Sequence, residues 1–217
     1  NYNLRELRNQ VGLVFQYPEH QLFEVNVLQD VCFGPKNQGL SPEECEKRAR
    51  EALQLVGLKE KYFDHSPFDL SGGQKRRAAI AGVLAMRPKV LVLDEPTAGM
   101  DAFARRQMWN LLKKLNQQKL TILLTTHYME EAETLCDRVG FMCGGRLEET
   151  DAPGHMIETL GRYAVDETSP DGLKSHYFHG KEEAIQYLSA SEQETALRST
   201  TLEDVFLETI GQQLECR

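Results

Sequence analysis

An apolar run that ends in two acidic residues is the feature that most constrains the fold of this chain. The run Val90 to Leu93 is followed directly by Asp94 and Glu95. A continuous apolar run of this length is typical of a strand that is covered on both faces of a parallel sheet. Two more strand-like runs, at residues 11–15 and 120–126, alternate with helical patterns along the chain. The alternation predicts an α/β fold with a mostly parallel sheet and right-handed crossovers.

A helical insert is predicted between the first strand and the acidic strand. Ser41 suits a helix N-cap, Pro42 suits the first helical position, and Glu44 completes the pattern of a helix start. Gly57 can end that helix. We therefore expect a helical subdomain at residues 17–88 within a core of residues 1–149. Shorter strand and helix patterns follow, which predict a small α+β accessory domain at residues 150–217.

Composition narrows the class of protein. Of the 217 residues, 41% are hydrophobic and 27% are charged, which is ordinary for a globular chain. The net charge of −8 argues against a nucleic-acid partner, and the simplest interpretation of Lys75, Arg76 and Arg77 is a solvated helix face. The longest apolar stretch, residues 78–86, is too short to cross a bilayer, so we expect no direct membrane span. The five scattered cysteines favour reduced thiols.

The residues at the strand ends suggest phosphate chemistry. Asp94 ends a strand, where ligands bind in α/β sheets, and its carboxylate could hold Mg²⁺ through water. Glu95 could act as a general base toward an attacking water. Ser71, Gly72 and Gly73 open a helix, whose exposed N–H groups and dipole favour an anion such as a γ-phosphate.

Gln16 and His127 are weak signals when each is taken alone, because both simply follow predicted strands. Their order along the chain makes them stronger: a strand with Gln16, a helical insert, Ser71 with two glycines, a strand with Asp94 and Glu95, then a strand with His127. The printed residues contain no G-x-x-x-x-G-K-[ST] loop, which would hold nucleotide phosphates. Together with Asn1 as the first residue, this predicts a fragment of a longer gene product.

Two motifs carry a family resemblance. Residues 70–74 read LSGGQ and residues 90–96 read VLVLDEP, and they resemble the signature and Walker B motifs of the nucleotide-binding subunits of ABC transporters. The resemblance covers about residues 1–147. It implies a P-loop NTPase-like core that uses ATP and Mg²⁺ and forms a head-to-tail homo- or heterodimer with a second ATPase subunit. It also implies transmembrane permease subunits as partners, and a cytoplasmic location on the inner face of the cell membrane.

The same resemblance assigns roles to single residues. Glu95 would polarise the attacking water, and His127 would contact the γ-phosphate. Asp94 would serve Mg²⁺, and Gln16 would sense Mg²⁺ and the water. The residues that would contact nucleotide held by the opposite subunit, or cross the interface, are Ser71, Gly72, Gly73, Gln74 and Asp101. Met100 stands where the family usually has leucine.

The two halves of the chain resemble different branches of this family. Residues 11–100 resemble the ATPases of energy-coupling factor transporters. Segments from residue 105 onward, such as residues 126–133 and 201–207, instead resemble drug- or polysaccharide-exporter ATPases. The seam lies between Met100 and Gln107, so the substrate and the direction of transport stay open.

Other classes of protein compete with a transport ATPase. One alternative is a non-catalytic interaction module derived from an ABC ATPase. Another is a soluble ABC-like ATPase of DNA repair or translation, which the acidic charge and the short interval between Gln16 and Ser71 disfavour. The apolar segment after Gln16, which includes Leu22 and Phe23, is expected either to dock a permease helix or to pack into the core of the insert.

Overall fold

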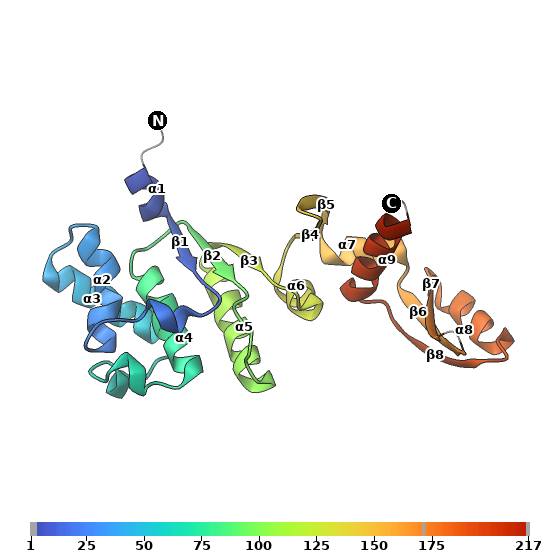
Figure 1. Ribbon diagram of the computed structural model, residues 1–217, viewed down its shortest axis with the longest axis horizontal. Coiled ribbons are helices and arrows are strands. Elements are labelled where there is room, and N and C mark those ends of the chain that lie inside the picture. Colours follow the sequence, from blue (N-terminus) through green and yellow to red (C-terminus); the bar gives the residue numbers. More distant parts are fainter. Residues whose placement is uncertain (1–3, 171, 216–217) are drawn as a thin grey trace. The chain divides into compact units, whose positions relative to one another are not determined.

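The structure is a computed structural model that describes residues 4–170 and 172–215 (Figure 1). Its contacts divide the chain into two units, Asn1–His127 and Tyr128–Arg217, called here the N-terminal and C-terminal units. This division falls earlier than the domain boundary predicted at residues 149/150. The reason is that α6 (Met129–Leu135) packs against α7 (Pro153–Leu160) and α9 (Leu202–Glu215), so it groups with the residues that follow it.

The N-terminal unit contains the predicted parallel sheet. Its strands are β1 (Val11–Val14), β2 (Val90–Asp94) and β3 (Thr121–Thr125), in the order β1-β2-β3 and parallel throughout. The carboxyl ends of parallel strands meet at one edge, and the predicted strand-end residues follow these strands. The sheet therefore gathers the residues that follow β1, β2 and β3 at one edge.

Helices pack against this sheet, and those between residues 17 and 88 make up the predicted helical insert (Figure 1). One face of the sheet leaves Leu13 and Leu123 42% and 59% exposed, so the expectation that the sheet is covered on both faces is wrong within the described ranges. The helices of the N-terminal unit are α1 (Leu4–Gln10), α2 (Val27–Asn37), α3 (Pro42–Leu55), α4 (Gly72–Leu84) and α5 (Ala102–Gln117), with short 3₁₀ helices at Pro18–Gln21, Glu60–Tyr62 and Pro67–Asp69. Helices α2, α3 and α4 pack on one another. Their core includes side chains that are fully buried, among them Val27, Val31, Leu53, Phe63 and Ile80.

The local signals for α3 are visible in its geometry. The Ser41 hydroxyl accepts a hydrogen bond from the Glu44 amide at 3.3 Å, and Pro42 occupies the first turn. Gly57 has φ of +73°, a left-handed conformation that glycine adopts without steric cost, just after the helix ends. The sequence prediction of this helix is confirmed at both ends.

Two glycines let other elements approach α4 closely. A Cβ atom added to Gly12 in β1 would lie 2.1 Å from the Val83 Cγ1 atom. One added to Gly34 in α2 would lie 2.6 Å from the Met86 Cγ atom and 3.2 Å from the carbonyl oxygen of Gly82. These distances are shorter than van der Waals contact, so any larger side chain would push β1 or α2 away from α4.

The C-terminal unit is an α+β arrangement, as the sequence predicts. Strands β4 (Val139–Cys143) and β5 (Arg146–Asp151) form an antiparallel pair, and a core of Ala132, Phe141, Met156, Leu202 and Val205 lies among α6, α7 and α9. A second antiparallel sheet follows in the order β7-β6-β8, made of β6 (Tyr163–Ser169), β7 (Gly172–Phe178) and β8 (Glu194–Ser199). Helix α8 (Lys181–Ala190) packs on this sheet.

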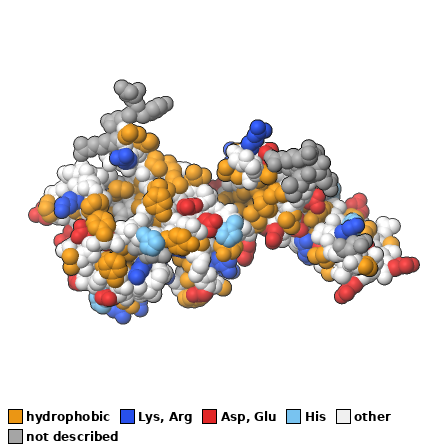
Figure 2. Space-filling model, viewed as in Figure 1, with side chains coloured by type: hydrophobic (Ala, Val, Ile, Leu, Met, Phe, Trp, Pro, Cys, Tyr) orange, Lys and Arg blue, Asp and Glu red, His pale blue; other side chains and the backbone are white. Residues whose placement is uncertain are grey.

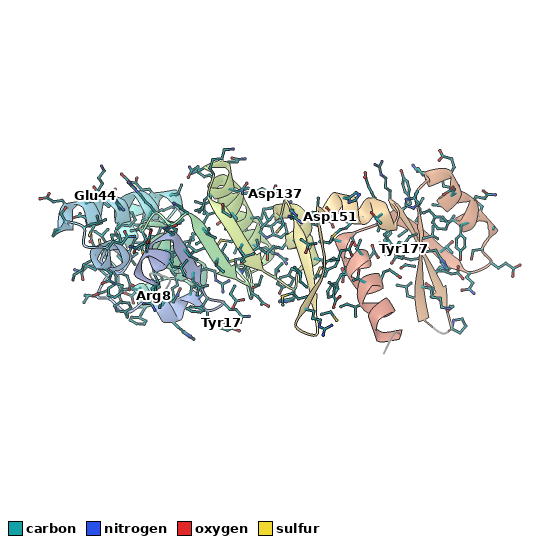
Figure 3. The ribbon with its side chains drawn as sticks, turned by 90° about the horizontal axis from the view of Figure 1, so that it is seen from above. Arg8, Tyr17, Glu44, Asp137, Asp151 and Tyr177 are labelled. Atoms are coloured by element: carbon teal, nitrogen blue, oxygen red, sulfur yellow. The ribbon has the colours of Figure 1, made fainter. Side chains whose placement is uncertain are left out.

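An ionic cluster ties this second sheet to the start of α9. The Arg198 guanidinium donates to Asp166 and Asp204 at 2.7 Å each. Asp204 also accepts from the Thr201 amide at 2.8 Å and from the Tyr177 hydroxyl at 3.3 Å; Tyr177 is labelled in Figure 3. One guanidinium, that of Arg198, thus forms ion pairs with two largely buried carboxylates, those of Asp166 and Asp204.

None of the helices in the described ranges is both long enough and apolar enough to span a membrane.

Candidate active site

Four of the predicted site residues meet at the carboxyl edge of the parallel sheet. Gln16 follows β1, Asp94 ends β2, Glu95 follows Asp94, and His127 lies two residues beyond β3. The sheet positions them because β1, β2 and β3 are parallel and adjacent, so chain segments far apart in the sequence leave the sheet side by side.

Glu95 is the centre of this group. Its Oε2 atom accepts a hydrogen bond from the Gln16 Nε2 atom at 2.9 Å, and its Oε1 atom lies 3.0 Å from the His127 Nδ1 atom. About a quarter of the Glu95 side chain is exposed, against 60% of His127. The carboxylate is thus held on both sides while it keeps access to solvent, which suits a group that must meet a water molecule.

The backbone at Glu95 is strained. Its φ is +44°, in the left-handed region that residues other than glycine rarely adopt. Such a conformation costs about 1–3 kcal/mol and persists only where the surroundings fix it. Here the Glu95 amide donates to the carbonyl oxygen of Thr125 at 3.0 Å and fixes the turn.

Asp94 and Gln16 provide oxygen atoms suited to Mg²⁺. The Asp94 Oδ1 atom accepts a hydrogen bond from the Thr125 hydroxyl at 2.6 Å, which fixes the carboxylate. Gln16 donates through Nε2, so its Oε1 carbonyl oxygen is the atom that could coordinate a cation. Within the described ranges no group of three or more His, Cys, Asp or Glu is placed to hold a metal.

Ser71 and Gln74 form a capping box at the start of α4. The Ser71 hydroxyl accepts from the Gln74 amide at 3.4 Å, and the Gln74 Oε1 atom accepts from the Ser71 amide at 2.9 Å. The amide groups of Gly72 and Gly73 occupy the first two helical positions, where no carbonyl within the helix can accept from them. The predicted anion site therefore rests mainly on these two glycine amides.

Nothing in the described part of the chain requires glycine at these two positions. Neither Gly72 nor Gly73 has a positive φ, and a Cβ added to either would have no atom within 4 Å. The glycines thus leave open space beside the start of a helix, which would let a ligand or another chain come close to the backbone.

Asp101 caps α5. Its Oδ1 atom accepts from the Ala104 amide at 2.9 Å. The side chains of Ser71, Gln74 and Asp101 therefore serve helix starts, whereas Gln16, Asp94, Glu95 and His127 form one group. The predicted roles of Ser71, Gln74 and Asp101 across a subunit interface stay predictions.

The interpretation of residues 75–77 as a solvated helix face is wrong for Arg76, which is only 6% exposed. Its guanidinium donates to the backbone carbonyl oxygens of Gln16, Pro96 and Ala98. Helical periodicity could have revealed this, because Arg76 lies three and four residues before the buried Ala79 and Ile80 and so shares their face.

The segment after Gln16 is partly buried and partly exposed, so core packing is confirmed for some of its residues and permease docking stays a prediction. Leu22 and Val27 are buried in the core, whereas Tyr17, Phe23 and Val25 are more than half exposed. Figure 3 labels Tyr17, and Figure 2 shows hydrophobic side chains exposed over β1 and β2 on the same unit.

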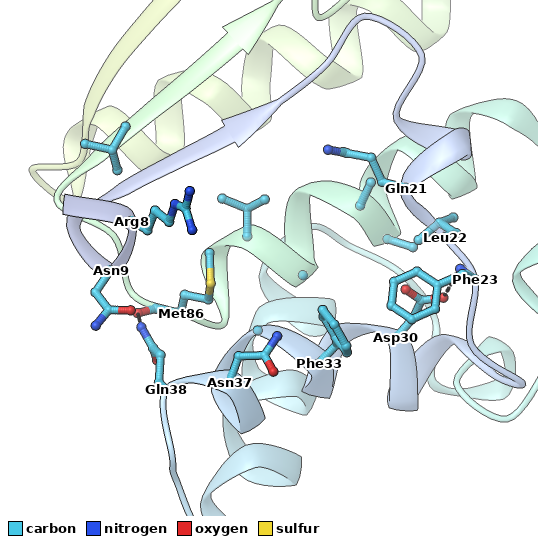
Figure 4. Close-up of a pocket in the computed structure, with 16 residues that line it drawn as sticks. Arg8, Asn9, Gln21, Leu22, Phe23, Asp30, Phe33, Asn37, Gln38 and Met86 are labelled. Carbon is cyan, nitrogen blue, oxygen red and sulfur yellow. Dashed lines mark hydrogen bonds between the residues drawn. The ribbon is translucent and has the colours of Figure 1, made fainter. Parts of the chain in front are cut away.

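A cavity of about 700 Å³ lies beside this segment, between α2 and α4 (Figure 4). Phe23 and Phe33 line it as an edge-to-face pair with ring centroids 4.9 Å apart. Asp30 accepts hydrogen bonds from the amides of Phe23 and Glu24, each at 2.9 Å, and so fixes the loop that carries Phe23. Burial raises the pKa of Asp30, although the two amide bonds act in the opposite direction.

The strand ends of this parallel sheet carry Gln16, Asp94 with Glu95, and His127, and a Ser-Gly-Gly sequence starts α4. Residues 1–98 match the family model described as ABC transporter. The chain thus contains an ABC transporter ATP-binding domain, as the resemblance predicted.

Proteins with similar sequences support the same assignment. The energy-coupling factor transporter ATP-binding protein EcfA2 of Streptococcus pneumoniae is 52% identical over 160 residues, which is 74% of this chain and 57% of that protein. The EcfA2 of Streptococcus pyogenes is 54% identical over the same shares. The chain therefore spans about 57% of the length of these relatives. Their similarity agrees with the energy-coupling factor resemblance predicted for residues 11–100; the exporter resemblance predicted beyond residue 105 stays a prediction.

Solved structures agree on the fold. The cbiO1 protein of Clostridium perfringens, part of the ABC transporter complex cbiONQ, has a TM-score of 0.64 at 42% identity, over 69% of this chain and 59% of that one. The ATP-binding cassette MJ0796, in a dimeric post-hydrolysis state bound to ADP and Pi, has a TM-score of 0.60 at 32% identity, over 69% of this chain and 65% of that one.

Proposed function

We propose that this chain acts as the ATP-binding and ATP-hydrolysing subunit of an ABC transporter that moves a solute across a membrane. The observation that carries the proposal is Glu95, held between Gln16 and His127 beside Asp94 at the carboxyl edge of a parallel sheet. Phosphoryl transfer needs mainly positioned water and neutralised charge. This group of side chains has the chemistry for both.

Each residue in the group has a proposed role. Glu95 accepts the proton of the water that attacks the γ-phosphorus, and His127 contacts the γ-phosphate. Asp94 and Gln16 hold Mg²⁺, which neutralises charge on the phosphates when it is bound. Because the printed residues contain no G-x-x-x-x-G-K-[ST] loop, an active site built around Glu95 needs that segment from elsewhere.

A second ATPase subunit is the proposed partner for the start of α4. Ser71, Gly72, Gly73 and Gln74 contact nucleotide held by that subunit, and Asp101 lies at the interface. The open space beside the two glycines supports this, since it leaves their amides accessible. A dimeric cassette is also found among the structures similar to this chain.

Transmembrane permease subunits are the other proposed partner, at the inner face of the cell membrane in the cytoplasm. Relatives of this chain include ATP-binding proteins of energy-coupling factor transporters and a component of cbiONQ. We propose that a permease helix docks beside Phe23 and Phe33 in the cavity between α2 and α4.

The first experiment tests whether the start of α4 acts on nucleotide in another subunit. The 217-residue chain is mixed with an ABC ATPase relative that is chosen because it contains a G-x-x-x-x-G-K-[ST] loop, and in which the serine of the LSGGQ motif is changed to arginine. The chain should restore ATP hydrolysis by supplying Ser71 in trans. Ser71→Arg in the chain should abolish that restoration, because a bulky cation would fill the anion position at the helix N-terminus.

Ser41→Arg is the matched control. Ser41 is also an exposed N-cap serine, on α3, so its replacement removes a cap without touching the start of α4. Restoration should survive this change. If hydrolysis is restored equally by Ser71→Arg, the role of the start of α4 is wrong. If the chain associates with the relative but never restores hydrolysis, the alternative of a non-catalytic interaction module is favoured.

A further inference from the structure

Arg76 is a buried cation that contacts two loops of the proposed active site. From the second turn of α4, its Nη2 atom donates to the Gln16 carbonyl oxygen at 2.6 Å. Its Nη1 atom donates to the carbonyl oxygens of Pro96 and Ala98 at 3.1 and 3.0 Å. The side chain therefore connects the end of β1 with the loop that follows β2.

These contacts lie on both sides of Glu95. The Gln16 side chain donates to the Glu95 carboxylate, and the backbone carbonyl oxygen of Gln16 accepts from Arg76. Pro96 follows Glu95 directly in the chain, and Arg76 holds its carbonyl oxygen as well. Hydrogen bonds from a charged donor are roughly twice as strong as neutral ones, and the planar guanidinium fixes the angles between its acceptors.

We infer that Arg76 is a positioning residue. It fixes the position of Gln16 relative to the loop that follows Glu95, and it couples movement of the start of α4 to the position of Glu95. This inference rests on the proposed function only in giving Glu95 a catalytic role. Ser71, which caps α4, lies less than two turns before Arg76 in the same helix. A displacement of α4 by a partner at its N-terminus would therefore move the guanidinium, and with it the backbone on both sides of Glu95.

Arg76→Lys tests the inference in the full 217-residue chain without nucleotide. A lysine keeps the charge but replaces the planar fork with a single compact donor group. Amide hydrogen exchange is measured at Ala98 and Met100, whose N–H groups close turns in the loop after Glu95. Exchange at Leu91 and Leu93, fully buried in β2, reports on the unit as a whole.

A second readout is the side-chain amide signal of Gln16 in a ¹⁵N NMR spectrum, assigned by its loss in Gln16→Glu. Because Gln16 Nε2 donates to Glu95, this signal reports the hydrogen bond at the proposed site. Arg77→Lys is the matched control. Arg77 is the next residue of α4, is partly exposed, and donates instead to the Gln107 side chain.

Arg76→Lys should speed exchange at Ala98 and Met100 by about ten- to a hundredfold, the range expected when charged hydrogen bonds are lost. Amide exchange at Leu91 and Leu93 should change far less, and the Gln16 side-chain signal should shift. Arg77→Lys should neither speed exchange at Ala98 and Met100 nor shift the Gln16 signal. Unchanged exchange in the loop would overturn the inference. So would equal acceleration at Leu91 and Leu93, including a failure to fold, because Arg76 would then stabilise the unit generally. Neither result bears on restoration of hydrolysis by Ser71, so the two proposals can fail separately.

Discussion

At the scale of the residue, Glu95 combines a strained backbone conformation with a central place among the candidate site residues. Its left-handed backbone is costly, yet the turn brings its carboxylate between Gln16 and His127. A glutamine at this position would keep the shape and one hydrogen-bond acceptor but could not take a proton. A substitution of Glu95 can therefore separate the rate of ATP hydrolysis from the affinity for nucleotide.

Glu95→Gln should slow ATP hydrolysis by roughly 10²–10⁴-fold while nucleotide binding is retained, which is the usual contribution of a positioned base. Turnover is measured after the chain is joined to the segment of an ABC ATPase relative that contains a G-x-x-x-x-G-K-[ST] loop. The exposed Glu46 of α3 offers the control, since Glu46→Gln should leave turnover unchanged. Unchanged turnover in Glu95→Gln would mean that the base is another residue.

Gly73 allows a residue-scale test of why glycine stands at the start of α4. Because a Cβ there meets no atom within 4 Å, Gly73→Ala should raise the free energy of unfolding, by about 0.5 kcal/mol. The same change should reduce the restoration of hydrolysis in trans, because the added methyl group lies where nucleotide would approach. Urea unfolding and the mixing assay measure the two effects, and an unimpaired assay would contradict the proposed close approach.

At the scale of the element, α4 organises the N-terminal unit. It packs against β1 and α2, it begins at the Ser71–Gln74 capping box, and it carries Arg76 into the site. Its neighbours can come this close because β1 and α2 present glycine to it.

Gly12→Ala should therefore destabilise the chain by about 1–3 kcal/mol, the usual cost of overpacking. The added Cβ would lie 2.1 Å from the Val83 Cγ1 atom, which sits on a helix that cannot move without disturbing the core. Urea unfolding measures the change, with Gly73→Ala as the glycine-to-alanine control in open space. Equal stability of the two variants would show that β1 shifts to accommodate the methyl group.

The ionic cluster of the C-terminal sheet should make stability depend on pH. The hydrogen bond from Arg198 lowers the pKa of Asp166 below its usual 3.8. Burial alone would raise the pKa of Asp204, but the hydrogen bonds from Arg198 and Thr201 outweigh it and lower the pKa. A lowered carboxyl pKa stabilises the fold above the unfolded value, and this contribution is lost as the pH falls through the folded value.

Arg198→Met should accordingly destabilise the chain more at pH 7 than at pH 3. At pH 3, below the unfolded value of 3.8, the carboxyl groups of the unfolded chain are already largely protonated, so part of the stability that the lowered pKa values supply is lost and the guanidinium contributes less. Urea unfolding of parent and variant at the two pH values measures this difference. If parent and variant differ in the free energy of unfolding by the same amount at pH 7 and pH 3, the charge of Arg198 is not the cause. The loss of stability would then come from the packing of the arginine side chain.

At the scale of the whole molecule, the exposed aromatic groups beside the α2–α4 cavity are the surface to which we assign the proposed permease contact. Phe23→Ser with Val25→Ser should abolish co-purification with a permease while circular dichroism stays unchanged, because both side chains are exposed. Leu22→Ser is the contrasting control: Leu22 is buried, so this change should lower the free energy of unfolding. Retained co-purification in the double variant would place the docking surface elsewhere.

The sequence alone was sufficient for the order of elements and for the residues at the strand ends. Strand runs, the Ser41–Pro42 helix start and the Ser71–Gln74 cap are local patterns, so each is encoded within a few neighbouring residues. The parallel sheet follows from their alternation, and it brings the strand ends together. For this reason the sequence predicts that Gln16, Asp94, Glu95 and His127 share one edge of the sheet, whereas the roles of Gln16 and His127 came from their order along the chain and from the family resemblance.

Only the tertiary structure decided which side chains are buried and what they bind. Gln16 and Glu95 are 79 positions apart, and Arg76 reaches a carbonyl group 60 positions away. Leu22 and Phe23 are adjacent in the chain, yet one lies in the core and the other at the surface. Burial and hydrogen bonds of this kind depend on segments that meet only when the chain packs. Periodicity along α4 could place Arg76 of the charge run on the buried face, but only the fold shows that it binds the carbonyl oxygens of Gln16, Pro96 and Ala98.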